Sequence, residues 1–316
     1  MKNIFKILSL ILIVGFSASS CNDNDEEPVM SQTIYAMASR DANLSSLKAA
    51  IDKAGLAATL DGTGTFTVFA PSNAAFTSFL QANGFTSLND VPAAALKEIL
   101  LNHVLAARVT SSEITTGYVS TLAKGAASST RNLSMFISKD SGVKVNGVAN
   151  VTTADILASN GVIHKTDAVI GLPTIVTHAL ANPNFSTLVS ALTRSDMPNF
   201  VGILGGTASS PFTVFAPTNA AFGSLLTELG ASGLAAIPQA TLENVLKYHV
   251  VAGANVASTD LTNNMSVTTF QGGMFTITTT GGAKIKDANN RVSNIVATDV
   301  QCSNGIIHAI DKVLLP

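Results

Sequence analysis

The sequence predicts two α+β domains in tandem. Two observations predict this: a long segment recurs after 146 residues, and each copy shows a helical hydrophobic period first and a period of two afterwards. Because helices come before strands within each copy, the class is α+β rather than an alternating α/β fold. The length of 316 residues also favours two domains of about 150 residues each.

The repeat is clearest in one segment of eleven residues. Residues 66–76 read FTVFAPSNAAF and residues 212–222 read FTVFAPTNAAF, so ten of eleven positions are identical. A repeat of this length is the size of a domain and much longer than a solenoid unit. We therefore predict domains over residues 31–172 and 173–316, with the boundary near Gly171–Pro173.

Helices are predicted in the first half of each copy. Asn43 is a suitable N-cap for a helix that carries Leu44, Leu47 and Ile51 on one face, and Asn184 begins the equivalent helix of the second copy. Another pair of helices is predicted to begin near Pro92 and Pro238, with His103 and His249 on their apolar faces.

The strand–turn–helix segment between these helices is explained residue by residue. Phe66–Ala70 is rich in β-formers and reads as a strand, which Pro71 ends. Ser72 is then the N-cap of a helix whose inner face carries Phe76. Every residue of the segment is therefore accounted for by structure.

The second half of each copy has the pattern of β-hairpins. Asn146–Gly147, Gly272–Gly273 and Gly281–Gly282 each follow and precede short alternating segments, as tight turns do. Each copy ends in an apolar strand, predicted over residues 162–170 and 306–315.

The first twenty residues have the pattern of a secretory signal peptide. Lys2 and Lys6 precede the apolar run Ile7–Phe16, which is too short to span a bilayer core of roughly 30 Å. Ala18–Cys21 resembles a bacterial lipobox, although Ala18 stands where Leu is usual. We expect Cys21 to be the lipid attachment site, and the alternative is an ordinary cleaved signal with a nearby Cys.

Residues 21–30 are predicted to be an acidic tether. Four acidic residues lie within residues 23–27, with no apolar partner to fold against. The run resembles the acidic export signal of lipoproteins that reach the outer face of the outer membrane. We therefore expect a surface-exposed outer-membrane lipoprotein, with the periplasmic face as the alternative.

Composition excludes several function classes. Lys and Arg number 18 and Asp and Glu number 20, so a net charge of −2 offers no general field for nucleic acid. Two Cys cannot form a disulfide framework or a four-Cys zinc site, and the five His show no short metal-ligand spacing. We expect no metal and no cofactor.

The isolated His and Cys residues are better explained by structure than by catalysis. We predict that His103 and His249 are buried and hydrogen-bonded, tying a helix to a neighbouring loop. His178 has no counterpart in the first copy and is expected to be exposed. Cys302 is predicted to be a small buried hydrophobe, since an extended strand would hold it about 20 Å from His308.

Three motifs, in the same order in each copy, resemble fasciclin-like (FAS1) domains, and the second of them is complete only in the second copy. They are the FTVFAP segment, the Tyr248–His249 pair and the Asn-Gly-Val/Ile-Ile-His segment at residues 160–164 and 304–308. The first copy departs from the family pattern with Asn102–His103 in place of Tyr-His. The resemblance implies a twisted antiparallel β-sandwich-like core with packed helices.

The resemblance also implies candidate partner-binding residues. Asp155–Ile156 is similar to the segment with which some animal fasciclin domains bind integrins, and Asp299–Val300 is its counterpart. Tyr248–His249 matches the family's other adhesive segment. The alternative is that Asp155 caps a turn and Ile156 fills the core.

Two functions follow as hypotheses. The first is a non-catalytic, lipid-anchored adhesion module that binds proteins or glycans on a cell or matrix surface. The second is an envelope lipoprotein that binds a small ligand or a carbohydrate, which the absence of Trp disfavours. We expect membrane association through the lipid alone, no nucleic-acid partner and no enzymatic activity.

Overall fold

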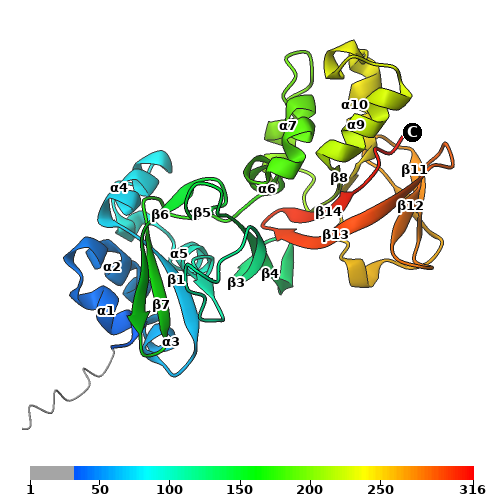
Figure 1. The fold of residues 1–316 in the computed structure, drawn as a ribbon. Helices are drawn as coiled ribbons and strands as arrows, with labels where there is room; N and C mark the ends of the chain where they lie inside the picture. Colours follow the sequence, from blue (N-terminus) through cyan, green and yellow to red (C-terminus); the bar gives the residue numbers. More distant parts are fainter. Residues whose placement is uncertain (1–31) are drawn as a thin grey trace, which may run out of the picture. The chain divides into compact units, whose positions relative to one another are not determined.

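The computed structural model describes residues 32–316. The expected signal peptide, Cys21 and the acidic tether lie outside the described residues. Within residues 32–316 the same succession of helices and strands occurs twice (Figure 1). No helix in this range has the length and apolar character that a membrane crossing requires.

The first repeat has five α-helices and seven strands among the described residues. The helices are α1 (Ile34–Arg40), α2 (Ser45–Lys53), α3 (Ala57–Asp61), α4 (Asn73–Ala82) and α5 (Ala93–Leu101). The strands are β1 (Phe66–Pro71), β2 (Val104–Leu105), β3 (Gly117–Gly125), β4 (Ser128–Ser138), β5 (Lys144–Val145), β6 (Ala149–Ala158) and β7 (Gly161–Thr166). The sheet order is β2-β1-β7-β6-β5-β4-β3.

The second repeat, again within the described residues, has the same numbers of both. The helices are α6 (Ile175–Ala181), α7 (Ser186–Leu192), α8 (Phe200–Gly205), α9 (Asn219–Glu228) and α10 (Gln239–Tyr248). The strands are β8 (Phe212–Pro217), β9 (Val250–Ala252), β10 (Met265–Thr268), β11 (Met274–Thr278), β12 (Lys284–Lys286), β13 (Val292–Cys302) and β14 (Gly305–Ile310). The order β10-β11-β12-β13-β14-β8-β9 reproduces the first sheet.

The first and last strands of each repeat lie side by side and are parallel. β1 pairs with β7, where Phe66 lies opposite Gly161, and β8 pairs with β14, where Phe212 lies opposite Gly305. The other strand pairs are antiparallel. The predicted α+β class is thus confirmed, and the predicted antiparallel pairing holds for all named strand pairs but one in each sheet. That one parallel pair joins the first strand of the repeat to its last strand.

In each repeat, an Asn side chain in the final hairpin forms a hydrogen bond with the first residue of the first helix. Asn160 Oδ1 accepts a hydrogen bond from the Ile34 amide at 2.9 Å, and its Nδ2 donates to the carbonyls of Leu60 and Gly62. In the second repeat Asn304 makes the equivalent bonds, including one of 3.0 Å from the Ile175 amide. One buried side chain therefore joins α1 or α6 to the last hairpin.

The predicted helix starts at Ser72, Pro92 and Pro238 are confirmed, and those at Asn43 and Asn184 are wrong. Ser72 accepts a hydrogen bond from the first turn of α4, as its counterpart Thr218 does from α9, and α5 and α10 begin directly after Pro92 and Pro238. Asn43 and Asn184, however, do not cap the next helices. Asp41 and Asn182, two residues earlier, instead cap short 3-10 turns that precede α2 and α7, and these two helices have no side-chain N-cap.

The predicted hairpin turns are confirmed. Asn146 and Gly147 adopt φ values of 47° and 71° between β5 and β6. Gly272 lies between β10 and β11, and Gly281 and Gly282 lie between β11 and β12. The last strands are shorter than predicted, since they end at Thr166 and Ile310.

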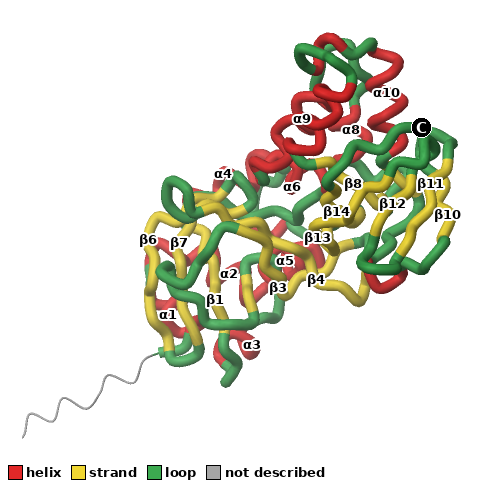
Figure 2. The backbone as a smooth tube through the Cα atoms, turned by 45° about the vertical axis from the view of Figure 1, so that its right-hand side comes forward, coloured by secondary structure: helices red, strands yellow, loops and turns green. Residues whose placement is uncertain are grey.

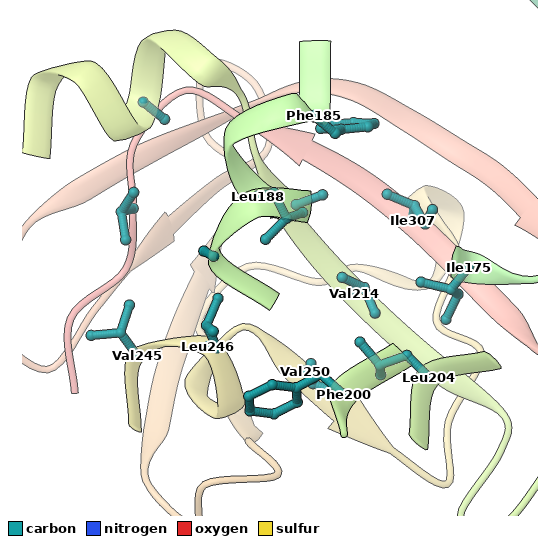
Figure 3. Close-up of a cluster of buried hydrophobic side chains, with 14 of the residues drawn as sticks. Ile175, Phe185, Leu188, Phe200, Leu204, Val214, Val245, Leu246, Val250 and Ile307 are labelled. Carbon is teal, nitrogen blue, oxygen red and sulfur yellow. The ribbon is translucent and has the colours of Figure 1, made fainter. Parts of the chain in front are cut away.

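The hydrophobic core of each repeat has two parts. One part lies between the helices and the strands, and the other lies among the later strands. In the second repeat the helices gather on one side of the strands (Figure 2). Figure 3 shows the helix-side cluster, in which Phe200 and Leu204 of α8 lie near Val214 and Val250.

Candidate functional site

Asp155 lies at a bulge between β6 and β7. The strand register shifts between Thr153 and Ile156, and Asp155 has a φ of 60°, in the left-handed region. Asp299, its counterpart in β13, has a φ of 62° at the equivalent shift. Asp tolerates this conformation better than most residues because its short polar side chain bonds locally.

Both carboxylates at the bulge are held by a serine from the loop that follows the second strand of the repeat. The Ser111 amide donates to Asp155 at 2.7 Å, and the Ser111 hydroxyl donates to the other carboxylate oxygen. Ser258 holds Asp299 in the same way, with an amide bond of 2.8 Å. The hydrogen bond from the Ser111 side chain is the main reason that the pKa of Asp155 is lowered.

A buried His completes this arrangement in each repeat. The Asp155 amide donates to His164 Nδ1 at 3.2 Å, so His164 Nε2 carries the proton and donates to the Val109 carbonyl at 2.9 Å. His308 bonds the Asp299 amide and the Val256 carbonyl in the same way. We call the set of Asp, Ser and His the bulge clamp. It ties the bulge to the loop at Val109–Ser111 or Val256–Ser258.

The two copies of the Asp-Ile segment differ in exposure. Ile156 is half-buried, and the next residue, Leu157, is 51% exposed. Val300 is buried in the second repeat. The backbone amide of the next residue, Gln301, donates a hydrogen bond to the Ser134 hydroxyl of the first repeat. Only the first segment therefore presents apolar side chains to solvent.

Tyr248 and His249 are both buried. The Tyr248 hydroxyl donates to the Met274 carbonyl at 2.6 Å and accepts from the Ala288 amide. Its ring packs edge-on against Phe275. These contacts position β11 against the end of α10.

The predicted role of His103 and His249 as ties between helix and loop is confirmed. His249 Nδ1 lies 2.7 Å from the Val245 carbonyl, and its Nε2 accepts from the Leu314 amide at 2.9 Å. His103 makes the equivalent bonds to Ile99 and Ile170. Burial lowers the pKa of both His side chains to about 4, so both are neutral at pH 7.

Asn102 replaces the Tyr of the family motif and acts differently. Its Nδ2 donates to the carbonyls of Ile170 and Gly171, near the predicted domain boundary. Asn102 therefore fixes the end of the first repeat, whereas Tyr248 fills a core.

The prediction that His178 is exposed is wrong. His178 is fully buried in α6 and packs edge-on against Tyr118 of β3. The sequence pattern around His178 did not indicate burial, because the contact that buries this side chain comes from a residue of the other repeat. Cys302 is buried as predicted, and burial raises the pKa of its thiol. The chain turns back after Cys302, which lies opposite Gly305, so the separation from His308 of about 20 Å that an extended strand would give does not apply.

Sequence reasoning missed Ser111 and Ser258 of the bulge clamp. A signal was present, because Val-x-Ser occurs at Val109–Ser111 and again at Val256–Ser258. Within residues 32–316 no group of three or more His, Cys, Asp and Glu is arranged to hold a metal ion. The bulge clamp therefore has a structural role, because it fixes the backbone next to the exposed end of the Asp-Ile segment.

The fasciclin domain family matches this chain twice, at residues 42–173 and 183–316. The chain belongs to the fasciclin family. Its two repeats are therefore tandem fasciclin domains, and the resemblance inferred from the three motifs is confirmed.

Relatives of this fasciclin protein come from bacteria and animals. An uncharacterized protein of Synechocystis sp., sll1735, is 38% identical over 144 residues, which are 46% of this chain and 98% of that protein. Human periostin is 27% identical over 268 residues, which are 84% of this chain and 30% of periostin. The fasciclin pair thus spans under a third of periostin.

A solved structure of a fasciclin domain pair, from the insect cell adhesion molecule fasciclin I, is also similar. It has 21% sequence identity and a TM-score of 0.48, over 89% of this chain and 96% of that chain.

Proposed function

We propose that this fasciclin protein is a non-catalytic adhesion module, lipid-anchored at Cys21 and displayed on the surface of the bacterial outer membrane. Its partner is a protein or glycan on a cell or matrix surface. One observation carries the proposal: the bulge of the first domain presents Leu157, 51% exposed, beside the half-buried Ile156. Family membership supports adhesion as the class of function.

The rigidity of the bulge supports a role in binding. Asp155 is fixed by Ser111, and its amide is fixed by His164. A contact surface that is already ordered loses less conformational entropy when a partner binds. The bulge clamp thus holds Ile156 and Leu157 in one orientation.

The other candidates contribute differently within the proposal. Tyr248, His249 and Val300 are buried, and Asp299 is half-buried whereas Asp155 is exposed. Binding of a partner would depend on these residues only indirectly, because they maintain the structure of the second domain. Direct contact is therefore assigned to Asp155–Leu157 alone.

A bead assay tests the proposed surface. Beads coated with residues 28–316 are expected to gather on at least one cell, matrix or glycan surface of a broad panel. Leu157→Glu is expected to reduce this binding by tenfold or more, because it places a charge in an apolar contact. Leu229→Glu is the matched control, since Leu229 is 54% exposed in the second domain.

Three results would contradict the proposed function. Beads that behave like blank beads across the panel would remove adhesion. Equal loss in both Leu variants would show a general charge effect, and unchanged binding by Leu157→Glu would remove the bulge surface. Thermal unfolding of each variant confirms that the fold is retained.

Two further measurements test the anchor and the location. Cys21→Ser is expected to abolish incorporation of labelled fatty acid and to release the protein from membranes. Protease added to intact cells is expected to degrade the protein. Protection until the outer membrane is broken would instead place it in the periplasm.

A further inference from the structure

The second domain contains an apolar pocket among α6, α7, α8 and the strands β8 and β14. Its cavity volume is about 40 Å³, and the surface exposed inside it is entirely apolar. Phe185, Leu188 and Leu204, which Figure 3 labels, are among the lining residues. Leu180 and Val201, 62% and 39% exposed, also line it and mark its opening to solvent.

Two lining side chains carry polar atoms, but these atoms are already bonded. Both ring nitrogens of His249 are engaged, with the Val245 carbonyl and the Leu314 amide. The Thr193 hydroxyl donates to the Val189 carbonyl at 2.8 Å. The pocket therefore offers no hydrogen bond to a ligand, and a polar group that entered it would lose its bonds to water.

Comparison of the two domains shows which residue differences leave this pocket open to solvent in the second domain. Thr33 and Thr174 cap the first helices of the two domains and lie 141 residues apart. The same spacing aligns three residues near the first two helices of the first domain with three in the second. The pairs are Tyr35 with Val176, Lys48 with Val189, and Asp52 with Thr193.

The three residues of the first domain form a polar cluster. The Tyr35 hydroxyl donates to Asp52 at 2.7 Å, and Lys48 forms an ion pair with the same carboxylate at 2.7 Å. In the second domain Val176, Val189 and Thr193 all line the pocket. The first domain thus has hydrogen-bonded polar groups where the second has an apolar opening.

We infer that the second domain binds the unbranched alkyl chain of an amphiphile. The chain end occupies the pocket, and the polar head group stays in water beyond Leu180 and Val201. A site for one water needs about 10–15 Å³, so the cavity admits the end of a narrow chain and not a sugar ring. A peptide is a poorer fit, because its amides would find no hydrogen-bond partner at this opening.

Binding of n-alkyl maltosides and n-alkyl carboxylates, each below its critical micelle concentration, tests this inference. The processed chain, residues 21–316, carries Cys21→Ser so that it bears no lipid of its own. Methyl resonances of Leu188, Leu204 and Ile307 are expected to shift saturably. Affinity is expected to rise about three- to fourfold per added methylene until the pocket is full, whichever head group is used.

The first domain supplies an internal control in the same sample. Leu47, Leu60 and Ile163 are the counterparts of the three reporter residues, and their resonances are expected to stay unchanged. The triple variant Val176→Tyr/Val189→Lys/Thr193→Asp transfers the polar cluster to the second domain and is expected to weaken binding at least tenfold. Leu180→Ser, a milder change at an exposed position, is expected to weaken it severalfold.

Several outcomes would overturn the inference. These are equal shifts in both domains, affinity that follows the head group but not the chain length, and unchanged binding by Leu180→Ser. If the triple variant does not fold, Leu180→Ser and the internal control still decide the question. Bead adhesion by Leu180→Ser is expected to be normal, so this inference can fail without the proposed adhesive function failing.

Discussion

The backbone amide of Asp155 lies 3.2 Å from Nδ1 of His164 and donates a hydrogen bond to it. The same contact joins Asp299 to His308 at 3.3 Å. Each contact spans two neighbouring strands at a bulge, so the imidazole replaces the strand partner that the bulge removes. The bulge is thereby a fixed part of both domains.

The carboxylate and the positive φ of Asp155 contribute separately to stability. Asp155→Ala is expected to lower the free energy of unfolding by about 1–3 kcal/mol. The variant loses the hydrogen bonds from Ser111, and Ala has no polar side chain to offset the strain of a φ of 60°. Asp155→Asn is expected to cost about 1 kcal/mol less, since Asn tolerates this conformation. Urea unfolding of both variants measures the difference, and equal losses would contradict it.

Acid is expected to destabilise the fold through its buried His residues. The pKa of His103 and His249 is about 4 in the folded protein against an ordinary value of 6.5, so the unfolded chain takes up protons first as pH falls. The free energy of unfolding therefore keeps the full contribution of the neutral His residues above pH 6.5 and loses it between pH 6.5 and 4. The loss at pH 5 is about 2 kcal/mol per His.

Urea unfolding at pH 7.5, 6 and 5 measures this loss. His249→Gln is expected to be less stable at pH 7.5 but to lose less stability on acidification, because one buried imidazole is gone. A free energy of unfolding that does not change between pH 7.5 and 5 would contradict the prediction.

All three Tyr side chains are expected to resist ionisation in the folded protein. Burial raises the pKa of Tyr118 to about 12 and raises that of Tyr248, and the hydrogen bond to Asp52 raises that of Tyr35. Tyrosinate absorbance reports this directly because the chain has no Trp. The folded protein is expected to titrate above pH 10 and the urea-unfolded chain near pH 10. Coincident curves would contradict this.

Two Gly residues of the second domain are expected to respond oppositely to substitution by Ala. At Gly305 a Cβ atom would lie 2.2 Å from the Phe212 carbonyl oxygen, so Gly305→Ala must separate β14 from β8 and cost more than about 3 kcal/mol. Gly223 lies in α9, where a Cβ atom meets nothing within 4 Å. Gly223→Ala is expected to stabilise by about 0.5–1 kcal/mol. Thermal unfolding measures both.

Local patterns predicted the local structure well. The Asn146–Gly147 turn and the Ser72 cap each depend on a few neighbouring residues, and both are confirmed. The caps at Asn43 and Asn184 were wrong by two residues, since a 3-10 turn and an α-helix start share the same preference for Asn and Asp.

Long-range contacts were harder to predict. The parallel pairing of β1 with β7 joins residues almost a hundred positions apart, and periodicity carries no information on such pairing. The burial of His178 depends on Tyr118 of the other repeat. The polar cluster at Tyr35 and its apolar counterpart at Val176 were present in the aligned repeats, but their meaning depends on which helix faces meet.

The Asn160 and Asn304 contacts have a consequence for synthesis on the ribosome. The Ile34 amide bonds a side chain that is made 126 residues later, and the Ile175 amide bonds one that is made 129 residues later. The first strand of each domain likewise pairs with the last. Neither domain can complete its fold until nearly all of it has emerged, so the nascent chain holds each set of helices exposed through most of its translation. Chaperone binding to the nascent chain would fall in that interval.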